Sequence, residues 1–185
     1  MTALEVGSFE GRSACWMLEH LLGHPDSRLY CVDTFEGSEE FAPELREGLL
    51  ERFTHNVCQT GRGVKVQALV GRSDDVLVGL IGEGVRADLA YVDGSHRAAE
   101  VLTDAVLCWK LLKPGGVMVF DDHLWRCRLG PDDLLLHPKL AVDGFVNAFF
   151  DRVDLLDLPG NAQVAVRKRP TDSEPGPSSD RGGER

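Results

Sequence analysis

The segment TALEVGSFEGRSACWMLEHLL, residues 2–22, contains the pattern that decides the fold. It begins with a short apolar run, continues through Gly7 and Gly11, and ends in a run with helical apolar spacing. Glycine lets a backbone turn tightly and lets a ligand approach it closely. The pattern therefore predicts a buried strand at 2–7, a tight loop and a helix, which is one repeating unit of an α/β sheet.

The same alternation continues along the chain. Apolar runs short enough for strands occur at 28–35, 64–71, 87–94 and 116–122. Two sets of apolar residues recur between these runs at helical spacing, and each predicts one buried helical face: Phe41, Leu45, Leu49 and Phe53, and then Leu102, Ala105, Val106, Trp109 and Leu112. Strands that alternate with helices predict a parallel sheet covered on both faces.

The pattern changes after the fifth predicted strand. The segments 152–158 and 161–168 both have strand character, and only the turn dipeptide ProGly separates them, so they must be antiparallel. We therefore predict a doubly wound α/β fold with a mostly parallel, Rossmann-like sheet. Residues 1–168 form one predicted domain, and 169–185, which has no large apolar residue, is a predicted disordered tail.

Composition narrows the class of ligand and the location. The formal net charge of −10 argues against nucleic-acid or anionic-membrane partners, since both need a basic surface. The N-terminus lacks the pattern of a signal peptide, and no window is apolar for long enough to span a membrane. Five cysteines without CxxC spacing fit reduced, structural thiols. We expect a cytoplasmic protein that acts on a small molecule.

The first two strand ends form a candidate cofactor site, because ligands of such sheets bind beyond the carboxyl ends of the strands. The glycine loop has GxxxG spacing instead of the GxGxxG of dinucleotide-binding proteins, and Glu5 precedes it. An acidic residue there would repel phosphate and would suit a ligand with an amino group. Asp33 ends the second strand, where a carboxylate can accept hydrogen bonds from both ribose hydroxyls. A plain tight turn is the alternative.

Acidic residues also follow two later strands, in YVDGSH (91–96) and VMVFDDH (117–123). Adjacent parallel strands would bring Asp93 close to Asp121 and Asp122. Three converging carboxylates repel one another unless a cation neutralises them, and oxygen ligands favour Mg²⁺, Mn²⁺ or Ca²⁺. In the alternative interpretation, Asp121 caps the following turn, Asp122 is solvated and Asp93 only supports its neighbours.

Residues 3–123 resemble a class I S-adenosylmethionine-dependent methyltransferase. The resemblance rests on LEVGSFEG (4–11), CVDTFEG (31–37), GRS (71–73) and LLKPGG (111–116). It implies S-adenosylmethionine as cofactor and a seven-stranded sheet whose last strand is antiparallel. The residues it places around the cofactor are Glu5, Gly7, Ser8 and Gly11 along the methionine part, Asp33 at the ribose, and Gly71, Arg72 and Ser73 by the adenine, together with Ser13, Thr34 and Asp93. Ser73 is also a candidate helix N-cap.

The DGSH motif and the later DD pair are similar to the metal-dependent, macrocin-type O-methyltransferases that act on macrolide sugars. This similarity implies that Asp93, Asp121 and Asp122 bind Mg²⁺, and that His96 is the general base with Asp93 beside it in catalysis. The acceptor would be a hydroxyl of a sugar or natural product. Helix capping is the alternative role for His96, and His123 is a weaker candidate base.

Other function classes compete with this one. A nicotinamide dehydrogenase would need a third glycine and a catalytic Tyr/Lys or His arrangement, and none is visible in the sequence. Catechol-type methyltransferases usually end the aspartate set in Asp-Asn, whereas this chain has Asp121 and Asp122. A non-catalytic module that binds S-adenosylmethionine remains a third interpretation.

The remaining expectations concern the edges of the site. Relatives of this type carry a helical cap before the first strand, whereas Met1 falls at that strand, so we expect the cap to be absent or supplied by residues 124–140 or by a second subunit of a homo-oligomer. Trp125 and Trp16 are candidate aromatic residues of the cleft, but Trp16 lies in a helical apolar run, so we expect it in the core together with Trp109. Four histidines are expected at the surface: His20, His24, His55 and His137.

Overall fold

The computed structural model describes residues 1–38, 42–126, 132–160 and 162–170. Most of the predicted tail and the start of the first predicted helical face, at Phe41, lie outside these ranges. None of the helices in the described part is long and apolar enough to span a membrane.

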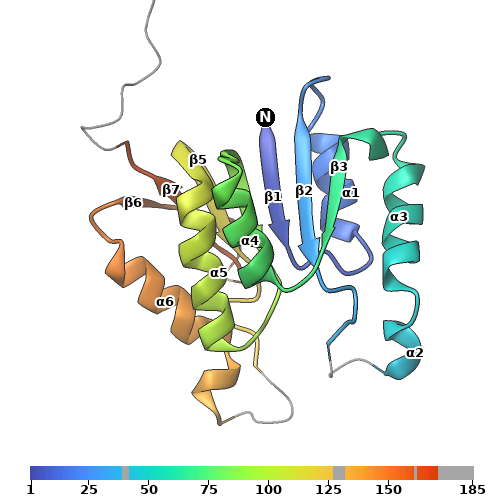
Figure 1. The fold of residues 1–185 in the computed structure, drawn as a ribbon. Coiled ribbons are helices and arrows are strands. Elements are labelled where there is room, and N and C mark those ends of the chain that lie inside the picture. The colour runs from blue at the N-terminus through green and yellow to red at the C-terminus, as the bar shows by residue number, and fades with distance from the viewer. Residues whose placement is uncertain (39–41, 127–131, 161, 171–185) are drawn as a thin grey trace, which may run out of the picture.

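One seven-stranded sheet forms the centre of the molecule, in the order β3-β2-β1-β4-β5-β7-β6 (Figure 1). The strands from β1 to β5 are parallel where they pair, and β7 runs antiparallel to both β5 and β6, which confirms the predicted fold class. The strands are β1 (Thr2–Val6), β2 (Arg28–Asp33), β3 (Val66–Val70), β4 (Ala87–Val92), β5 (Leu112–Phe120), β6 (Val153–Leu156) and β7 (Val164–Lys168).

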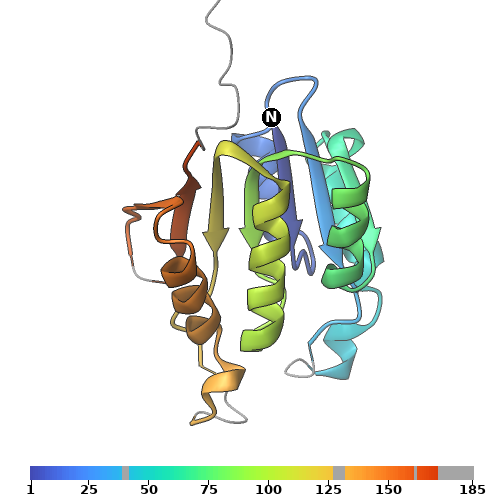
Figure 2. The ribbon, with the colours of Figure 1, turned by 60° about the vertical axis from the view of Figure 1, so that its left-hand side comes forward.

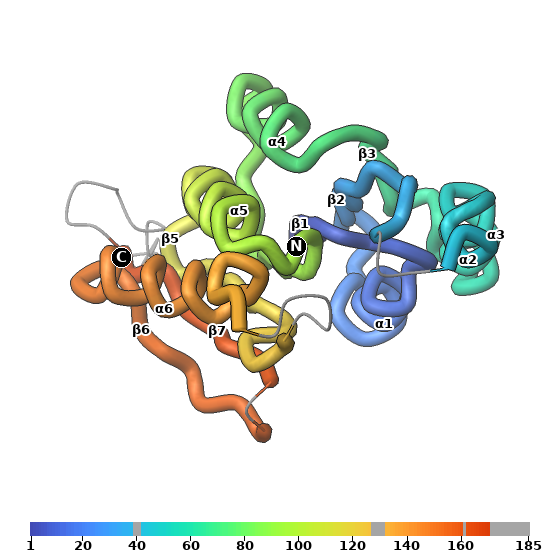
Figure 3. The backbone as a smooth tube through the Cα atoms, turned by 90° about the horizontal axis from the view of Figure 1, so that it is seen from below, coloured from blue at the N-terminus to red at the C-terminus, as the bar shows by residue number. Residues whose placement is uncertain are grey.

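Helices cover the two faces of the sheet unequally (Figures 2 and 3). On one face α4 (Ser73–Gly82), α5 (Ala98–Leu111) and α6 (Pro138–Ala148) pack side by side and bury a continuous apolar core against the sheet. On the other face α1 (Arg12–His20) and α3 (Leu49–Gln59) enclose a smaller core, centred on β1 and β2. Within the described chain, no helix covers this second face over β5 and β7.

The structure corrects some of the predicted faces. The helical run through Leu45 and Phe53 is broken into a short α2 (Pro43–Arg46) and α3, because Gly48 adopts a left-handed conformation between them. Leu45 is consequently half exposed, and Leu102 on α5 is 40% exposed. Trp109 is buried as predicted, with its ring against Phe145 of α6.

Two further predictions fail. Trp16 is 53% exposed, because it lines the open cleft described below instead of the core, and its ring stacks on His20. His137 is buried, because it directly precedes α6 where that helix packs on the protein, and its Nε2 atom has no hydrogen-bond partner in the described structure.

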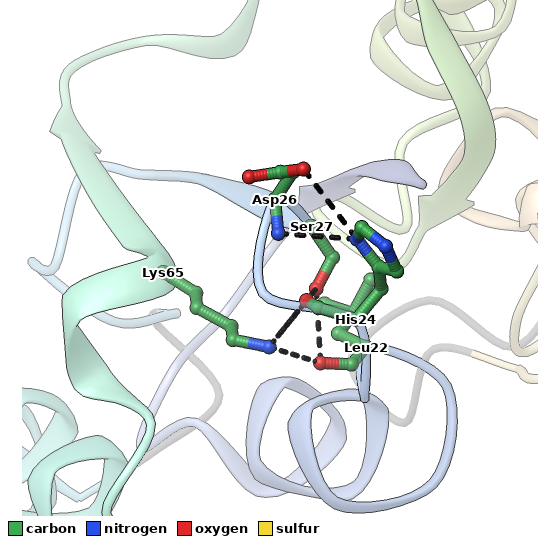
Figure 4. Close-up of polar contacts among 5 residues, drawn as sticks. All are labelled: Leu22, His24, Asp26, Ser27 and Lys65. Carbon is green, nitrogen blue, oxygen red and sulfur yellow. Dashed lines mark hydrogen bonds and ion pairs between the residues drawn. The ribbon is translucent and has the colours of Figure 1, made fainter.

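A lysine fixes the connection between α1 and β2 (Figure 4). Lys65 ends the short 3₁₀ helix η1 (Gly63–Lys65), and its Nζ donates to the carbonyl oxygens of Leu22 at 2.6 Å and His24 at 2.7 Å. It also approaches the fully buried Ser27 hydroxyl at 3.1 Å. Both carbonyl groups lie beyond the end of α1 and also accept a hydrogen bond from the Ser27 hydroxyl, and hydrogen bonds from a charged donor are stronger than those from a neutral one. Lys65 thus anchors the connection that follows α1, and the beginning of α1 forms part of the cleft described next.

Candidate active site

The carboxyl ends of the parallel strands open into one large cleft. Its walls come from the loops that follow β1 to β5, and its volume is about 1620 Å³. Pockets for single small ligands usually measure about 300–1,000 Å³. The cleft is therefore large enough to hold two small molecules together.

The glycine loop after β1 is shaped by packing within the protein. Gly7 has a φ of +86°, and a Cβ atom there would lie 2.0 Å from the backbone oxygen of Asp93. Gly11 has a φ of +85°, and its Cβ would meet the Phe53 ring at 2.9 Å. Glycine at both positions is thus explained without a ligand. The consequence for the site is that the β1 loop lies directly against the β4 loop.

Asp33 holds the glycine loop in place. Its Oδ2 atom accepts hydrogen bonds from the backbone N–H groups of Ser8 and Phe9, both at 2.8 Å. Its Oδ1 atom accepts a third from Phe35 at 2.7 Å. Asp33 lines the cleft as the sequence predicted, and it has a second, structural role there that the spacing of residues did not reveal.

Glu5 lies beneath the loop and does not line the cleft. It is fully buried, and its Oε2 atom accepts a hydrogen bond from the Ser8 hydroxyl at 2.5 Å. Burial raises the pKa of Glu5, although the hydroxyls of Ser13 and Ser8 oppose this shift. Glu5 therefore acts on the cleft through serine side chains that do line it.

The predicted adenine-side residues gather at the start of α4. Gly71, Arg72 and Ser73 all line the cleft, together with Ser13 and Thr34. Ser73 is not the N-cap, because α4 begins at Ser73 itself and the capping position is held by Arg72. The Arg72 guanidinium pairs with Asp74 at 3.3 Å, on the exposed side.

Asp104 of α5 is a cleft-lining residue that the sequence analysis missed. It is 2% exposed, its Oδ1 atom has no hydrogen-bond partner in the described structure, and its Oδ2 atom lies near Gly94. Burial raises the pKa of Asp104 to about 6, while the nearby Ser73 hydroxyl lowers it. The only sequence signal was an acidic residue on the apolar face of a predicted helix.

The β4 and β5 loops bring three potential metal ligands together. One ligand atom each from Asp93, His96 and Asp122 lies within 4.8 Å of the others. The His96 Nε2 atom is 3.2 Å from Asp122 Oδ2. Asp122 has a positive φ of 54°, which turns its side chain away from the alternation of the strand. His96 does not cap α5, whose N-cap is Arg97.

Asp121 is held apart from this group. Its carboxylate accepts hydrogen bonds from the Tyr91 hydroxyl at 2.6 Å and from Gln163 Nε2 at 3.1 Å. The structure thus brings His96 together with Asp93 and Asp122, while Asp121 lines the same cleft and is hydrogen-bonded to Tyr91 and Gln163; the set of Asp93, Asp121 and Asp122 as metal ligands stays a prediction. Tyr91 and Gln163 were missed because hydrogen-bond partners from β4 and the β6–β7 turn leave no pattern in the sequence.

The carboxylates in this region interact strongly. Burial raises the pKa of Asp93 to about 8, and the charges of Asp121 and Asp122 add to the shift. Burial and the hydrogen bond to Asp121 also raise the pKa of the Tyr91 hydroxyl. A cation at this position would relieve the repulsion among the carboxylates.

The two histidines near Asp93 and Asp122 have different neighbours. The Trp125 ring stacks on the His96 imidazole, with 3.9 Å between ring centroids, and so fixes the plane of that ring. His123 points elsewhere, since its Nε2 atom lies 2.9 Å from Asp143 of α6. His96 is accordingly the histidine that faces the acidic cluster.

Comparisons with known proteins agree with this geometry. Residues 4–123 match a protein family described as a methyltransferase domain. A search of curated proteins finds no significant match. Similar solved structures include the O-methyltransferase TomG from Streptomyces achromogenes in complex with SAM, with 22% identity and a TM-score of 0.68 over 91% of this chain and 73% of that one.

Two other solved structures have the same fold. An O-methyltransferase from Bacillus cereus in complex with SAH has 19% identity and a TM-score of 0.68, over 90% of this chain and 74% of that one. The O-methyltransferase NovP has 18% identity and a TM-score of 0.68, over 91% and 72%.

Proposed function

Since the chain belongs to the methyltransferase-domain family, we propose that it transfers a methyl group from S-adenosylmethionine to a hydroxyl of a small molecule, with help from a divalent cation. One observation carries the proposal: the group formed by Asp93, His96 and Asp122 opens into the same cleft as Asp33 and the glycine loop. Cofactor and reactive groups would then meet in one space.

The cofactor half of the cleft suits S-adenosylmethionine in charge and shape. Asp33 would accept hydrogen bonds from the ribose, and Ser8 and Ser13, backed by Glu5, would face the methionine part. Gly71, Arg72 and Ser73 would flank the adenine, with Thr34 beside the ribose. An acidic lining favours a ligand that carries a sulfonium and an amino group. The similar structures of TomG and the Bacillus cereus enzyme contain SAM and SAH, which supports the same choice here.

The reactive half of the cleft suits proton removal from a hydroxyl. Methyl transfer from a sulfonium is an in-line displacement, so the acceptor oxygen must lie close behind the methyl carbon. The His96 Nε2 atom lies 3.2 Å from Asp122 Oδ2, so in the tautomer whose Nε2–H donates to Asp122 the hydroxyl proton would go to Nδ1. Asp122 would then stabilise the imidazolium that forms. The Trp125 ring would hold the imidazole plane fixed during this transfer.

A divalent cation would fit the same three side chains. Two carboxylates and an imidazole favour Mn²⁺ or a similar ion over Ca²⁺, which prefers oxygen ligands, and they also permit Mg²⁺. A bound ion would supply Lewis acidity toward the acceptor oxygen. His96 could then ligate the ion through Nε2 or donate from that atom to Asp122, but one Nε2 atom cannot do both at once.

Titration calorimetry with S-adenosylhomocysteine, followed by a methyl-transfer assay on a panel of hydroxyl compounds, tests the proposal. We expect micromolar binding, and turnover that Mn²⁺ or Mg²⁺ raises and EDTA removes. Binding without any methyl transfer would favour the non-catalytic module. The absence of binding at millimolar ligand, or the binding of NADH in its place, would refute the proposal.

A further inference from the structure

An apolar strip leads from the acidic group along the uncovered face of the sheet. Side chains alternate between faces along a strand, so Leu89, Tyr91 and Asp93 of the β4 segment point to the same face. The register of β4 and β5 sets Leu89 beside Val117 and Tyr91 beside Val119. We call these four residues the apolar strip: Leu89, Tyr91, Val117 and Val119. All four are partly exposed in the described structure.

Helix α1 lies at the Leu89 end of this strip, because Leu89 packs against the core cluster that contains Ala14 and Met17 of α1. Trp16 and Leu21 line the same cleft as Leu89 and Val119, and they are 53% and 39% exposed. Asp93 is four positions after Leu89, which corresponds to about 13 Å along a strand. This side of the cleft is therefore apolar at Leu89, Tyr91 and Val119 and acidic at Asp93, whereas the cofactor side is polar.

The acidic end restricts the charge of any molecule that lies in this side of the cleft. The carboxylates of Asp93, Asp121 and Asp122 all line that end. The chain as a whole carries a formal net charge of −10. An anionic acceptor would be repelled as it approached, whereas a neutral or cationic one would not.

We propose that the methyl acceptor is a neutral or cationic molecule with a flat apolar body, which lies on the apolar strip against Trp16 while its hydroxyl reaches His96. This inference rests on the proposed function and names the substrate class for the same site. It is supported by Leu89, Tyr91 and Val119 of the strip, which line the same cleft as the reactive residues. Ligand pockets generally combine an apolar lining with a few polar groups that fix orientation, as this side of the cleft does.

Three related probe molecules separate the effect of a flat ring system on affinity from the effect of a negative charge. Catechol has two neighbouring hydroxyls on a single ring, alizarin has the same pair on a flat three-ring body, and alizarin red S adds a sulfonate. Their affinities would be measured by calorimetry with saturating S-adenosylhomocysteine and without added metal, so that chelation does not contribute. The variants are Trp16→Ala and Val119→Thr, and the control is Val64→Ala, whose side chain is 87% exposed and does not line the cleft.

We expect alizarin to bind at least about tenfold more tightly than catechol, and alizarin red S to lose most of that gain. Trp16→Ala and Val119→Thr should each weaken alizarin binding about fivefold or more, and leave catechol and S-adenosylhomocysteine unchanged. Val64→Ala should bind all probes like the wild type.

Other outcomes would overturn the inference. Equal affinities for catechol and alizarin, in a protein that binds S-adenosylhomocysteine, would refute it and leave the proposed function intact. Equal affinities for alizarin and its sulfonate would refute the charge restriction. Sedimentation velocity provides a further check, since a dimer that Trp16→Ala dissociates would show that a second copy of the chain occupies the strip.

Discussion

Replacing Asp33 with alanine should weaken both the fold and cofactor binding. The change removes the acceptor of three backbone N–H groups, from Ser8, Phe9 and Phe35, at 2.7–2.8 Å. Hydrogen bonds to charged groups contribute about 1.5–3 kcal/mol each, but water can replace part of this in an open cleft. We therefore expect the free energy of unfolding to fall by about 2–4 kcal/mol, which a typical domain survives.

The same substitution should lower the affinity for S-adenosylhomocysteine by about 10–100-fold, or about 1.4–2.8 kcal/mol, through loss of the ribose contacts and of the loop geometry. Urea denaturation measures the first effect and titration calorimetry the second. Asp33→Asn keeps one acceptor oxygen and should show roughly half of each effect. Asp151→Ala, at a side chain that is 81% exposed, is the matched control.

The two measurements separate the two roles of Asp33. Lower stability with unchanged affinity would show that Asp33 only anchors the glycine loop, and the ribose role would be wrong. Wild-type behaviour in both measurements would contradict the reasoning from the hydrogen bonds as well.

Three further predictions concern other parts of the chain. Asp122→Asn should lower metal-dependent turnover at least about tenfold, because Asp122 faces His96 and not the glycine loop. It should keep the affinity for S-adenosylhomocysteine within about twofold of the wild type. Equal losses of turnover and of affinity would contradict this prediction. Lys65→Met should lower the free energy of unfolding by about 1–2 kcal/mol in urea, since two carbonyl groups lose a charged donor; an unchanged urea midpoint would count against this anchor. For Asp104, burial raises the pKa from 3.8 to about 6, so the stability that its proton provides is complete below pH 3.8 and is lost as the pH rises through 6. As the pH rises from 4 to 6.5, the free energy of unfolding of Asp104→Asn, measured by urea denaturation, should therefore rise by about 2–3 kcal/mol relative to that of the wild type. A difference in stability that does not vary with pH would refute the assignment.

The sequence predicted the fold well because apolar periodicity and strand length report directly on burial. Its errors arose where a single backbone conformation or a single neighbour decided the outcome. Gly48 broke the helical face that contains Leu45, and the exposure of Trp16 to the cleft could not be inferred from spacing alone.

The candidate site was predicted to a lesser extent, for a related reason. Strand ends showed which acidic residues would share an edge of the sheet. They did not show how each side chain would be oriented. The positive φ of Asp122 turns it toward His96, and Tyr91 and Gln163 hold Asp121 in another direction. Such details depend on partners that are distant along the chain, and no local pattern records them.

The position of β7 determines when the site can be completed during synthesis. This strand, Val164–Lys168, inserts between β5 and β6, and Gln163 just before it is bonded to Asp121. The other strands of the cleft are all translated earlier. On the ribosome, β5 must consequently wait with an unpaired edge until β7 has left the exit tunnel, and such an edge invites pairing with other chains. The end of the cleft at Asp121 is thus completed after the glycine loop, and premature termination of translation before residue 163 would leave a nascent protein that has the glycine loop but lacks the contact of Gln163 with Asp121.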